Sequence, residues 1–334
     1  METRLLNEII ACLPNDRTVF RYAQDDYAVM LLSHYAGCGK RITDIKRSPY
    51  GGLLEKPAIK SLIAGCGHGV LTQTDVNYVY ASATANTYAN DRQNFVLTLG
   101  KWDRDHPCFS QTTSNSANLV LQLNFNMGHD RLFHRLIGND EVDYFKYDGH
   151  PVLSRRVPQP KEGQEGGVRR YRNTLGWARM DLDFDTGEVL IEEIQNDWLR
   201  RARRYLKMMT TYIANNPDYK NKLGIKSTAE TIEHYVKQIL RPFYHLWDEA
   251  ILSAVITFCI EELGIKRVYY HTFDTGNRLK KITGRYPPKS LYSSLPKKFC
   301  FTVTDDVPAF LAKSKAVKRK LKRVKNPHWH ALTL

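Results

Sequence analysis

The chain has 334 residues, of which 42% are hydrophobic and 11% aromatic, a composition that supports one large or two medium folded units and argues against disorder throughout. Lys and Arg outnumber Asp and Glu by 49 to 35, and the formal net charge of +14 favours an anionic partner: nucleic acid, an anionic membrane surface or a phosphate-bearing ligand. No apolar run reaches the roughly 20 residues that span a bilayer, and six dispersed cysteines lack a CxxC pair or a secretory signal, so we expect no membrane span, reduced thiols and a cytoplasmic location.

The first half of the chain contains short periodic segments separated by polar residues. Helices are predicted over 5–12, 27–34 and 58–64, where apolar residues recur at helical spacing. Strands are predicted over 94–99 and 119–125, which are rich in Val, Leu and Phe and bounded by polar residues. These elements alone indicate no role for this half.

The second half has clearer patterns. The predicted elements are, in chain order, a strand over 179–184, a turn at 185–187, a strand over 188–195, helices over 197–212, 228–240 and 248–263, and a strand over 266–273. Gly264 ends the last of these helices, as a glycine just beyond a helix commonly does. Helix, glycine and strand in direct succession are typical of an α/β unit packed on a sheet.

The predicted fold class is therefore α/β (or α+β), with a mixed sheet and flanking helices. A polar Pro/Gly/Glu stretch at 158–167 is typical of a linker. It separates an N-terminal module of unknown role (1–157) from a second domain (168–310), which a basic tail (311–334) follows. From Lys313 to Lys325 the tail has eight Lys or Arg and no acid, a composition that also suits a solvated, poorly ordered terminus.

The most informative segment is the string IEEIQNDW at 191–198. In a regular strand Glu192 and Glu193 point to opposite faces, each among aliphatic neighbours. A buried carboxylate is paired, protonated or placed in a polar cleft, so either a salt bridge to an arginine or a catalytic role explains it. The strand end is where sites of α/β sheets commonly lie. The candidate residues of this segment are Glu192, Glu193, Gln195, Asn196, Asp197 and Trp198.

The helix after this strand has a cationic face. Arg200, Arg203, Arg204 and Lys207 recur at the spacing of one helical face, which suits contact with phosphates, although a solvated face has the same pattern. Arg200 and Arg201, next to the strand, are candidates for binding a substrate or cofactor. The candidate nucleic-acid contacts are Arg203, Arg204, Lys207, Lys318, Arg319, Lys320, Lys322 and Arg323.

Three further polar positions come later in the chain. His271 and Thr272 lie near the end of the strand KRVYYHTF, and Asn277 lies in the polar turn TGN that follows. We include them as candidates for substrate or cofactor binding. Tyr292 begins a short helix in PPKSLYSSLPKKFCF; a Tyr among apolar neighbours is commonly a core residue, and the alternative is a proton donor at a site.

The order of these motifs resembles the second half of the GNAT acyltransferase fold, over roughly 180–303. In that family the last segment has a Tyr, a short helix and a Gly-Phe strand, which Tyr292 and Cys300-Phe301 match with Cys in place of Gly. IEEIQNDW also resembles an EIQSDW segment of uncharacterised phage and mobile-element proteins. The GNAT resemblance implies an acyltransferase in which Glu192 or Glu193 is the general base and Tyr292 the general acid.

The same resemblance implies acyl-CoA as the donor. The family's acyl-CoA loop, an Arg/Gln-x-x-Gly-x-Gly/Ala run, follows the strand that EVLIEEIQ matches, but here the residues are NDWLRRARRYL, without glycine. Glycines allow the pyrophosphate to approach backbone N–H groups at a helix start. Arg200 and Arg201 compensate in part, and an aminoacyl-tRNA or another nucleic-acid-linked donor is the alternative.

Two other functions stay open on the sequence. One is a non-catalytic nucleic-acid-binding protein, which the net charge, the cationic helix face and the tail support. The other is a transferase or hydrolase acting on a nucleotide, in which Glu192, Glu193, Gln195, Asp197 and His271 bind substrate or a divalent ion. No zinc site is predicted, because no standard module has the spacing of Cys38, Cys66, His68, His106 and Cys108.

Overall fold

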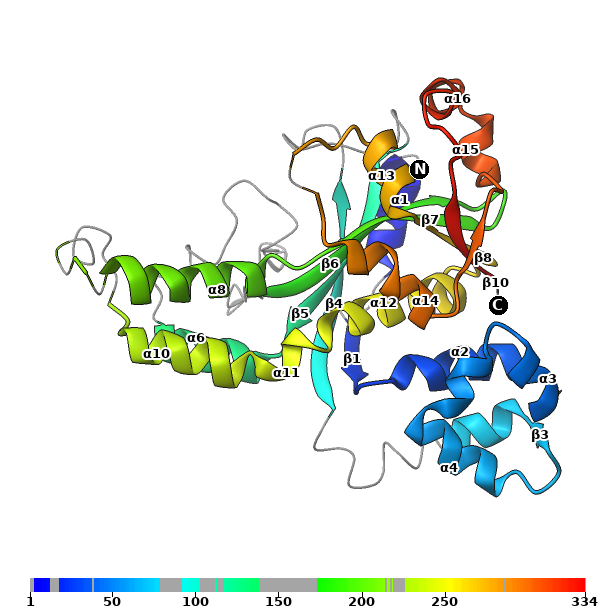
Figure 1. Ribbon diagram of the computed structural model, residues 1–334, viewed down its shortest axis with the longest axis horizontal. Coiled ribbons are helices and arrows are strands. Elements are labelled where there is room, and N and C mark those ends of the chain that lie inside the picture. The colour runs from blue at the N-terminus through cyan, green and yellow to red at the C-terminus, as the bar shows by residue number, and fades with distance from the viewer. Residues whose placement is uncertain are drawn as a thin grey trace, which may run out of the picture.

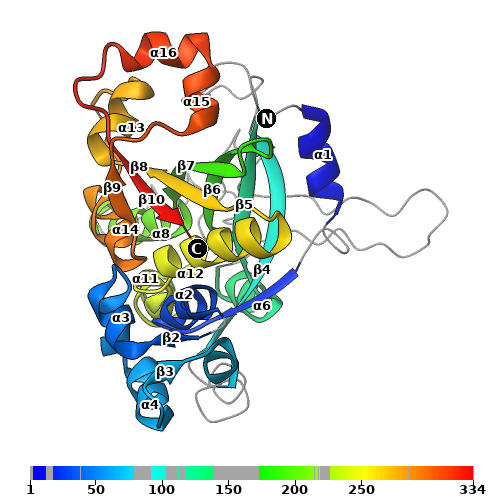
Figure 2. The ribbon, with the colours of Figure 1, turned by 90° about the vertical axis from the view of Figure 1, so that its right-hand side faces the viewer.

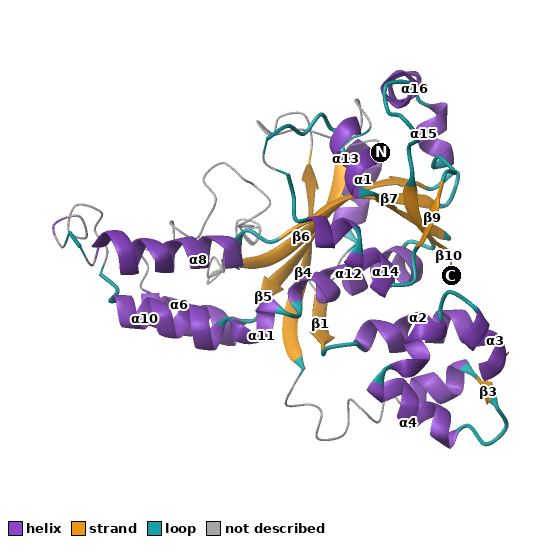
Figure 3. Cartoon of the chain, in the orientation of Figure 1, coloured by secondary structure: helices purple, strands orange, loops and turns teal. Residues whose placement is uncertain are grey.

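A computed structural model gives the architecture of the chain. It describes residues 3–12, 18–37, 39–78, 92–102, 112, 117–137, 173–213, 215–216, 218, 226–284 and 286–333. The protein is an α/β structure with a large mixed sheet and flanking helices, as the sequence predicts (Figures 1 and 3). None of the helices in these ranges is long and apolar enough to cross a membrane.

Eight strands form the main sheet in the order β1-β4-β5-β6-β7-β8-β10-β9. In chain order they are β1 (Thr18–Tyr22), β4 (Gln93–Trp102), β5 (Asn118–Phe125), β6 (Thr174–Asp183), β7 (Glu188–Gln195), β8 (Arg267–His271), β9 (Thr302–Thr304) and β10 (Trp329–Thr333). β7 and β8 pair in parallel, while the other neighbouring pairs are antiparallel. A small second sheet pairs β2 (Lys40–Arg41) with β3 (Val70–Leu71).

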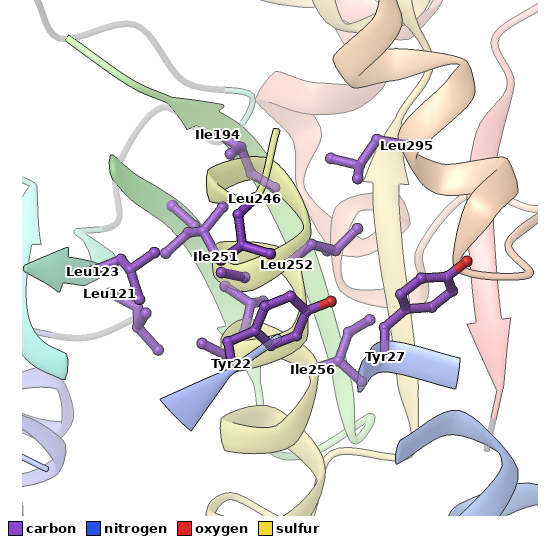
Figure 4. Close-up of a cluster of buried hydrophobic side chains, with 14 of the residues drawn as sticks. Tyr22, Tyr27, Leu121, Leu123, Ile194, Leu246, Ile251, Leu252, Ile256 and Leu295 are labelled. Atoms are coloured by element: carbon purple, nitrogen blue, oxygen red, sulfur yellow. The ribbon is translucent and has the colours of Figure 1, made fainter. Parts of the chain in front are cut away.

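One face of the sheet is covered by α12 (Trp247–Thr257), which continues as η6 (Phe258–Glu262). This helix contacts β5, β6 and β7, and its residues from Ala250 to Ile256 are all buried. Figure 4 shows Ile251 and Leu252 among side chains of the surrounding strands. The helix ends before Gly264, whose φ of +64° is the left-handed conformation expected of a glycine at this place. The short elements η7 (Lys289–Tyr292) and α14 (Ser294–Lys298) follow in the chain.

The other face of β7, β8 and β10 is covered by the end of the chain. α13 (Phe273–Leu279), α15 (Ala309–Lys313) and α16 (Lys315–Leu321) lie over it (Figure 2). Their apolar side chains form a second buried cluster with the strands: Leu190, Tyr269, Leu279, Leu311, Val317, Val324 and Trp329. Val189 and Ile191 belong instead to the main core, so the alternation of β7 divides its side chains between the two clusters.

A helical arm extends from the carboxyl end of β7 (Figure 1). Its elements are α6 (Met127–Ile137), α8 (Trp198–Lys207), η4 (Met208–Ile213), α10 (Ala229–His234), η5 (Tyr235–Ile239) and α11 (Arg241–Tyr244). Trp198 holds the arm together, because its indole Nε1 donates to the Tyr235 hydroxyl at 2.7 Å and its ring packs edge-on to Phe133. His129 stacks on Phe125 at 3.6 Å and is a core histidine.

An N-terminal group of helices packs against α12 and α14. It consists of α2 (Asp26–Ala36), α3 (Ile42–Arg47), η2 (Gly51–Glu55) and α4 (Pro57–Gly65), and α1 (Thr3–Ala11) lies elsewhere, against β4. Tyr27 stacks on Phe299 at 4.5 Å, while Lys298 forms ion pairs with Asp25 and Glu249. These contacts join α2 to α12 and α14, so this N-terminal group of helices is packed on the second half of the chain.

Two expectations about organisation need correction. The modules expected at 1–157 and 168–310 share one sheet, because β5 pairs with β6 over six residue pairs and continues the ladder across the boundary. The segment 311–334, expected as a basic tail, is folded: it contains α16 and β10, and β10 lies between β8 and β9. Trp329 and Leu332 give it an apolar anchor, which the charge-based interpretation overlooked.

Candidate functional site

A cleft opens where β7 and β8 separate. The two strands pair only from Glu188 to Ile191 of β7, whereas β7 continues alongside β6 to Gln195. The cleft has a volume of about 630 Å³. Its lining comes from the end of β7, from α8, from the end of α11, from the start of α12, and from η7 with the segment before it: Glu193, Ile194, Gln195, Asn196, Leu199, Arg200, Arg203, Arg204, Tyr244, Trp247, Ile282, Tyr286, Pro287, Pro288, Leu291 and Tyr292.

The two glutamates do not lie apart on opposite faces, as regular alternation predicts. The register of β6 and β7 shifts, so that Arg179 opposes Glu193 while Met180 opposes Ile191, and Glu192 is the extra residue of a β-bulge. Both carboxylates are influenced by the charges of Arg179 and Lys280. The bulge therefore brings both acids into one cluster with these cations.

Glu192 is sealed inside this cluster. Its carboxylate accepts hydrogen bonds from the Thr112 backbone N–H at 2.9 Å and the Thr112 hydroxyl at 3.1 Å, and it lies 3.3 Å from His271 Nε2. Burial alone raises the pKa of Glu192, but the hydrogen bond and charge of His271, with Arg179 and Lys280, lower it to about 2. Glu192 is fully buried and does not line the cleft, so its contacts fit a structural role.

Glu193 does line the cleft. Its Oε2 lies 3.1 Å from an Arg179 guanidinium nitrogen and 3.6 Å from Lys280 Nζ. Burial raises the pKa of Glu193, but Arg179 and Lys280 outweigh it and the pKa is lowered. Arg179 is itself fixed by Asn118 Oδ1 at 3.1 Å and by the Trp102 ring. The result is an ionised carboxylate that is held rigidly at the inner wall of the cleft.

Tyr292 lines the same cleft. Its ring packs 5.3 Å from the Tyr270 ring, and burial raises its pKa, so the phenol stays protonated at neutral pH. Its hydroxyl has no hydrogen-bond partner among the described residues, whereas its backbone oxygen lies 2.8 Å from His330 Nε2. The hydroxyl proton is thus available to a ligand in the cleft.

Three arginines of α8 form a basic wall in the cleft. They are Arg200, Arg203 and Arg204. Arg203 stacks over the Tyr244 ring at 4.1 Å, an arrangement that holds the guanidinium plane in place. Arg200 forms an ion pair with Asp197. Lys207, on the same helix, is exposed but does not line the cleft.

The remaining candidates near β7 have structural contacts. Gln195 Nε2 donates to Glu193 Oε1 at 3.4 Å, and Asn196 Oδ1 caps α8 by accepting from the Leu199 backbone N–H at 2.9 Å. Asp197 is buried, and Trp177 donates to its carboxylate at 3.4 Å. Trp198 lies in the aromatic core of the arm and Arg201 is half-buried, so neither lines the cleft.

Apart from Tyr292, the candidates after β8 lie outside the cleft. Asn277 was expected in a polar turn, but the TGN residues fall inside α13 and Asn277 is buried. Thr272 donates to the backbone oxygen of His328 at 2.9 Å and so fixes the approach to β10. Lys320 is half-buried, and its Nζ donates to the Thr112 backbone oxygen at 2.8 Å rather than facing solvent. The other tail candidates are exposed: Lys318, Arg319, Lys322 and Arg323.

Several residues of the site were not selected from the sequence. Arg and Lys side chains commonly lie at the surface of a protein. Arg179 is buried beside the glutamates by the pairing of β6 with its neighbouring strands, and Lys280 by its place at the C-cap of α13. Tyr244, Trp247 and Tyr286 supply the aromatic wall. The segment YPP at 286–288 carried a usable signal, because prolines next to an aromatic residue are typical of a rigid rim.

The residues at the start of α8 bear on the acyl-CoA donor that the sequence suggests. At the start of α8 the Leu199 N–H is occupied by Asn196 and the Asp197 carboxylate lies beside it, so the helix start does not fit a pyrophosphate; the arginines fit an anion instead. No group of three metal-ligating side chains occurs in the described ranges, and Cys38, His106 and Cys108 lie outside them. Comparisons of the chain with protein-family models, with curated proteins and with solved structures give no match.

Proposed function

We propose that the cleft transfers an acyl group from a phosphate-bearing donor to an amine. The observation that carries this proposal is the shared lining: an ionised carboxylate (Glu193), a protonated phenol (Tyr292) and a wall of three arginines face the same space. Acid, base and anion-binding groups in one cleft are the requirements of this reaction.

The arginine wall is the part of the cleft that suits the donor. A guanidinium group offers planar, paired donors that match phosphate oxygens, and Arg203 is already held by Tyr244. The aromatic and proline residues next to it, Trp247, Tyr286 and Pro287, suit an apolar or planar part of the same molecule.

The acid and base suit the transfer step. The amine nitrogen attacks the acyl carbon, so a C–N bond forms while the bond from the acyl carbon to the leaving group breaks. Glu193 accepts the proton that the amine loses, and Tyr292 donates its proton to the leaving group. Exchange of protons with water restores both residues. The lowered pKa of Glu193 keeps the carboxylate ionised at neutral pH, so it has a free site for a proton, and the raised pKa of Tyr292 keeps the phenol protonated, so it has a proton to give.

The backbone around Tyr292 is consistent with the GNAT-like resemblance that motivates this proposal. Tyr292 ends η7, the short helix α14 follows, and the chain then enters β9. Cys300, which stands where the resemblance has glycine, has a φ of +61°, a conformation that favours glycine. The positive φ at this position is what a glycine would provide there, and it supports the proposal.

Ligand-dependent stabilisation tests the donor part of the proposal. Thermal unfolding is measured with acetyl-CoA, with aminoacyl-tRNA and with simple nucleotides, because a ligand that binds the folded state raises its melting temperature. Stabilisation by an acyl-bearing donor that is lost in the variant Arg203→Gln supports the proposal. Stabilisation by unacylated nucleotides alone would replace it with a nucleotide-acting enzyme.

A further inference from the structure

The last helix carries a basic surface that the cleft does not use. We call it the α16 ridge, which comprises exposed cations of α16 and of the turn that follows it: Lys315, Lys318, Arg319, Lys322, Arg323 and Lys325. None of these six forms an ion pair within the described part of the chain, whose pairs involve other residues. The ridge is thus an uncompensated group of cations on a folded element.

The opposite side of α16 is firmly anchored. Val317 and Val324 are buried in the cluster with Leu190 and Tyr269 of the sheet. Lys320, half-buried on this inner side, donates to the Thr112 backbone oxygen. The exposed cations therefore belong to a rigid surface, which loses less conformational entropy on binding than a disordered basic tail does.

No acid neutralises the ridge along the chain. The last acidic residues, Asp305 and Asp306, precede α15, and Asp305 is engaged by His328. Like charges three or four residues apart on a helix repel one another. A surface that retains this repulsion, although its other side is well packed, is suited to a partner that supplies the negative charge.

The chemistry of the ridge favours nucleic acid over a membrane. A helix that binds at a lipid surface inserts an apolar face, but the apolar face of α16 is already buried against the sheet. No large hydrophobic side chain is exposed between residues 307 and 333. The same lack of exposed aromatics removes stacking on unpaired bases, so the contacts left are those to phosphates.

We propose that the α16 ridge binds the phosphate backbone of a nucleic-acid duplex without sequence preference. Lys315 and Arg319 fall on successive turns of α16, about 5.4 Å apart along the helix, and Lys322 caps its end, so these three cations can reach neighbouring phosphates. The ridge is separate from the arginine wall of α8, because Figure 1 shows α8 extending from the sheet to the left and α16 at the upper right. The proposal of duplex binding is therefore independent of the proposed acyl transfer.

The test compares two variants that each lose four charges. The ridge variant is Lys318→Gln, Arg319→Gln, Lys322→Gln and Arg323→Gln. The control, in β2, α3 and α4 near the N-terminus, is Arg41→Gln, Lys46→Gln, Arg47→Gln and Lys60→Gln, and all eight residues are exposed. Binding to a labelled DNA duplex of mixed sequence is measured by fluorescence anisotropy at several salt concentrations. Circular dichroism and thermal unfolding verify that both variants are folded.

The ridge variant is expected to lose at least tenfold in affinity, and its plot of log affinity against log salt is expected to flatten by about one unit for each lost phosphate contact. The control is expected to stay within about twofold of the unchanged protein. Equal losses in both variants, or unchanged binding by the ridge variant, would overturn the proposal. So would a protein that ignores the duplex but binds phosphatidylserine vesicles through the same residues, since the partner is then a membrane.

Discussion

Lys280 Nζ lies 3.6 Å from Glu193 Oε2 and donates a hydrogen bond to the backbone oxygen of Glu192 at 2.6 Å. One side chain at the C-cap of α13 thus holds both the proposed base and the bulge that positions it. Burial lowers the pKa of Lys280, while the charges of Glu193 and Glu192 raise it in turn. The cation and the carboxylates are mutually dependent, and this gives the first prediction.

Replacing Lys280 by Met is expected to raise the pKa of Glu193, because one of the two cations that lower it is removed. Transfer activity that needs the ionised carboxylate falls as the pH drops through that pKa. The acid limb of the pH–activity profile is therefore expected to move to higher pH in Lys280→Met. Lys281→Met, an exposed neighbour, is the control, and an unmoved acid limb would show that Glu193 is not the group being titrated.

Tyr292→Phe removes the proposed proton donor without disturbing the packing. The transfer rate is expected to fall roughly 10²- to 10⁴-fold, the usual contribution of a general acid. Because the Tyr292 hydroxyl has no hydrogen-bond partner in the described residues, thermal stability is expected to stay nearly the same. Tyr286→Phe, another phenol lining the cleft but largely exposed, is the matched control and is expected to retain activity. Equal rate losses in the two variants would argue against a specific role for Tyr292.

Arg203→Gln is expected to weaken binding of a phosphate-bearing donor about tenfold, equivalent to about 1.4 kcal/mol. Arg203→Lys is expected to recover part of this loss, because it keeps the charge but loses the planar stacking on Tyr244. Lys207→Gln removes an equal charge from the same helix outside the cleft. Donor binding by the three variants is measured by isothermal titration calorimetry. Equal losses of affinity in Arg203→Gln and Lys207→Gln would show an effect of net charge rather than a contact in the cleft.

Glu192 gives a prediction about stability and pH. Its pKa in the folded protein is about 2, against an ordinary value of 4.5, so its contribution to stability is complete above pH 4.5 and is lost as the pH falls towards 2. Glu192→Gln is expected to cost about 1–3 kcal/mol at neutral pH, since His271 and Thr112 lose a charged partner. The same variant is expected to lose less stability on acidification. Urea unfolding at pH 7 and pH 3 measures both effects, and parallel losses for the two proteins would contradict this role.

Local patterns predicted the elements of the second half well. β7 has the predicted bounds, the helices expected at 197–212 and 248–263 form, and Gly264 ends the second of them. These succeed because alternation, helical spacing and a terminal glycine are local signals. Glu193 and Tyr292, nearly a hundred residues apart in the chain, line one cleft.

What failed depends on long-range pairing. The bulge at Glu192 arises from the register between β6 and β7, and no residue in IEEIQNDW signals it. β10 follows a lysine-rich segment in the sequence, which drew attention away from it. Its position between β8 and β9 is fixed by antiparallel pairing with residues much earlier in the chain. Charge suggested a solvated tail because the few apolar residues that anchor it, such as Val317 and Trp329, are scattered among the cations.

The most direct test of the central claim is mass spectrometry of an amine acceptor incubated with the protein and an acyl donor that stabilises it. Acyl transfer adds a defined mass to the acceptor, and the account predicts this product with the unchanged protein and its near-complete loss in Glu193→Gln and Tyr292→Phe. Product formed at unchanged rates by both variants would contradict the claim that these two residues carry out the transfer in the cleft.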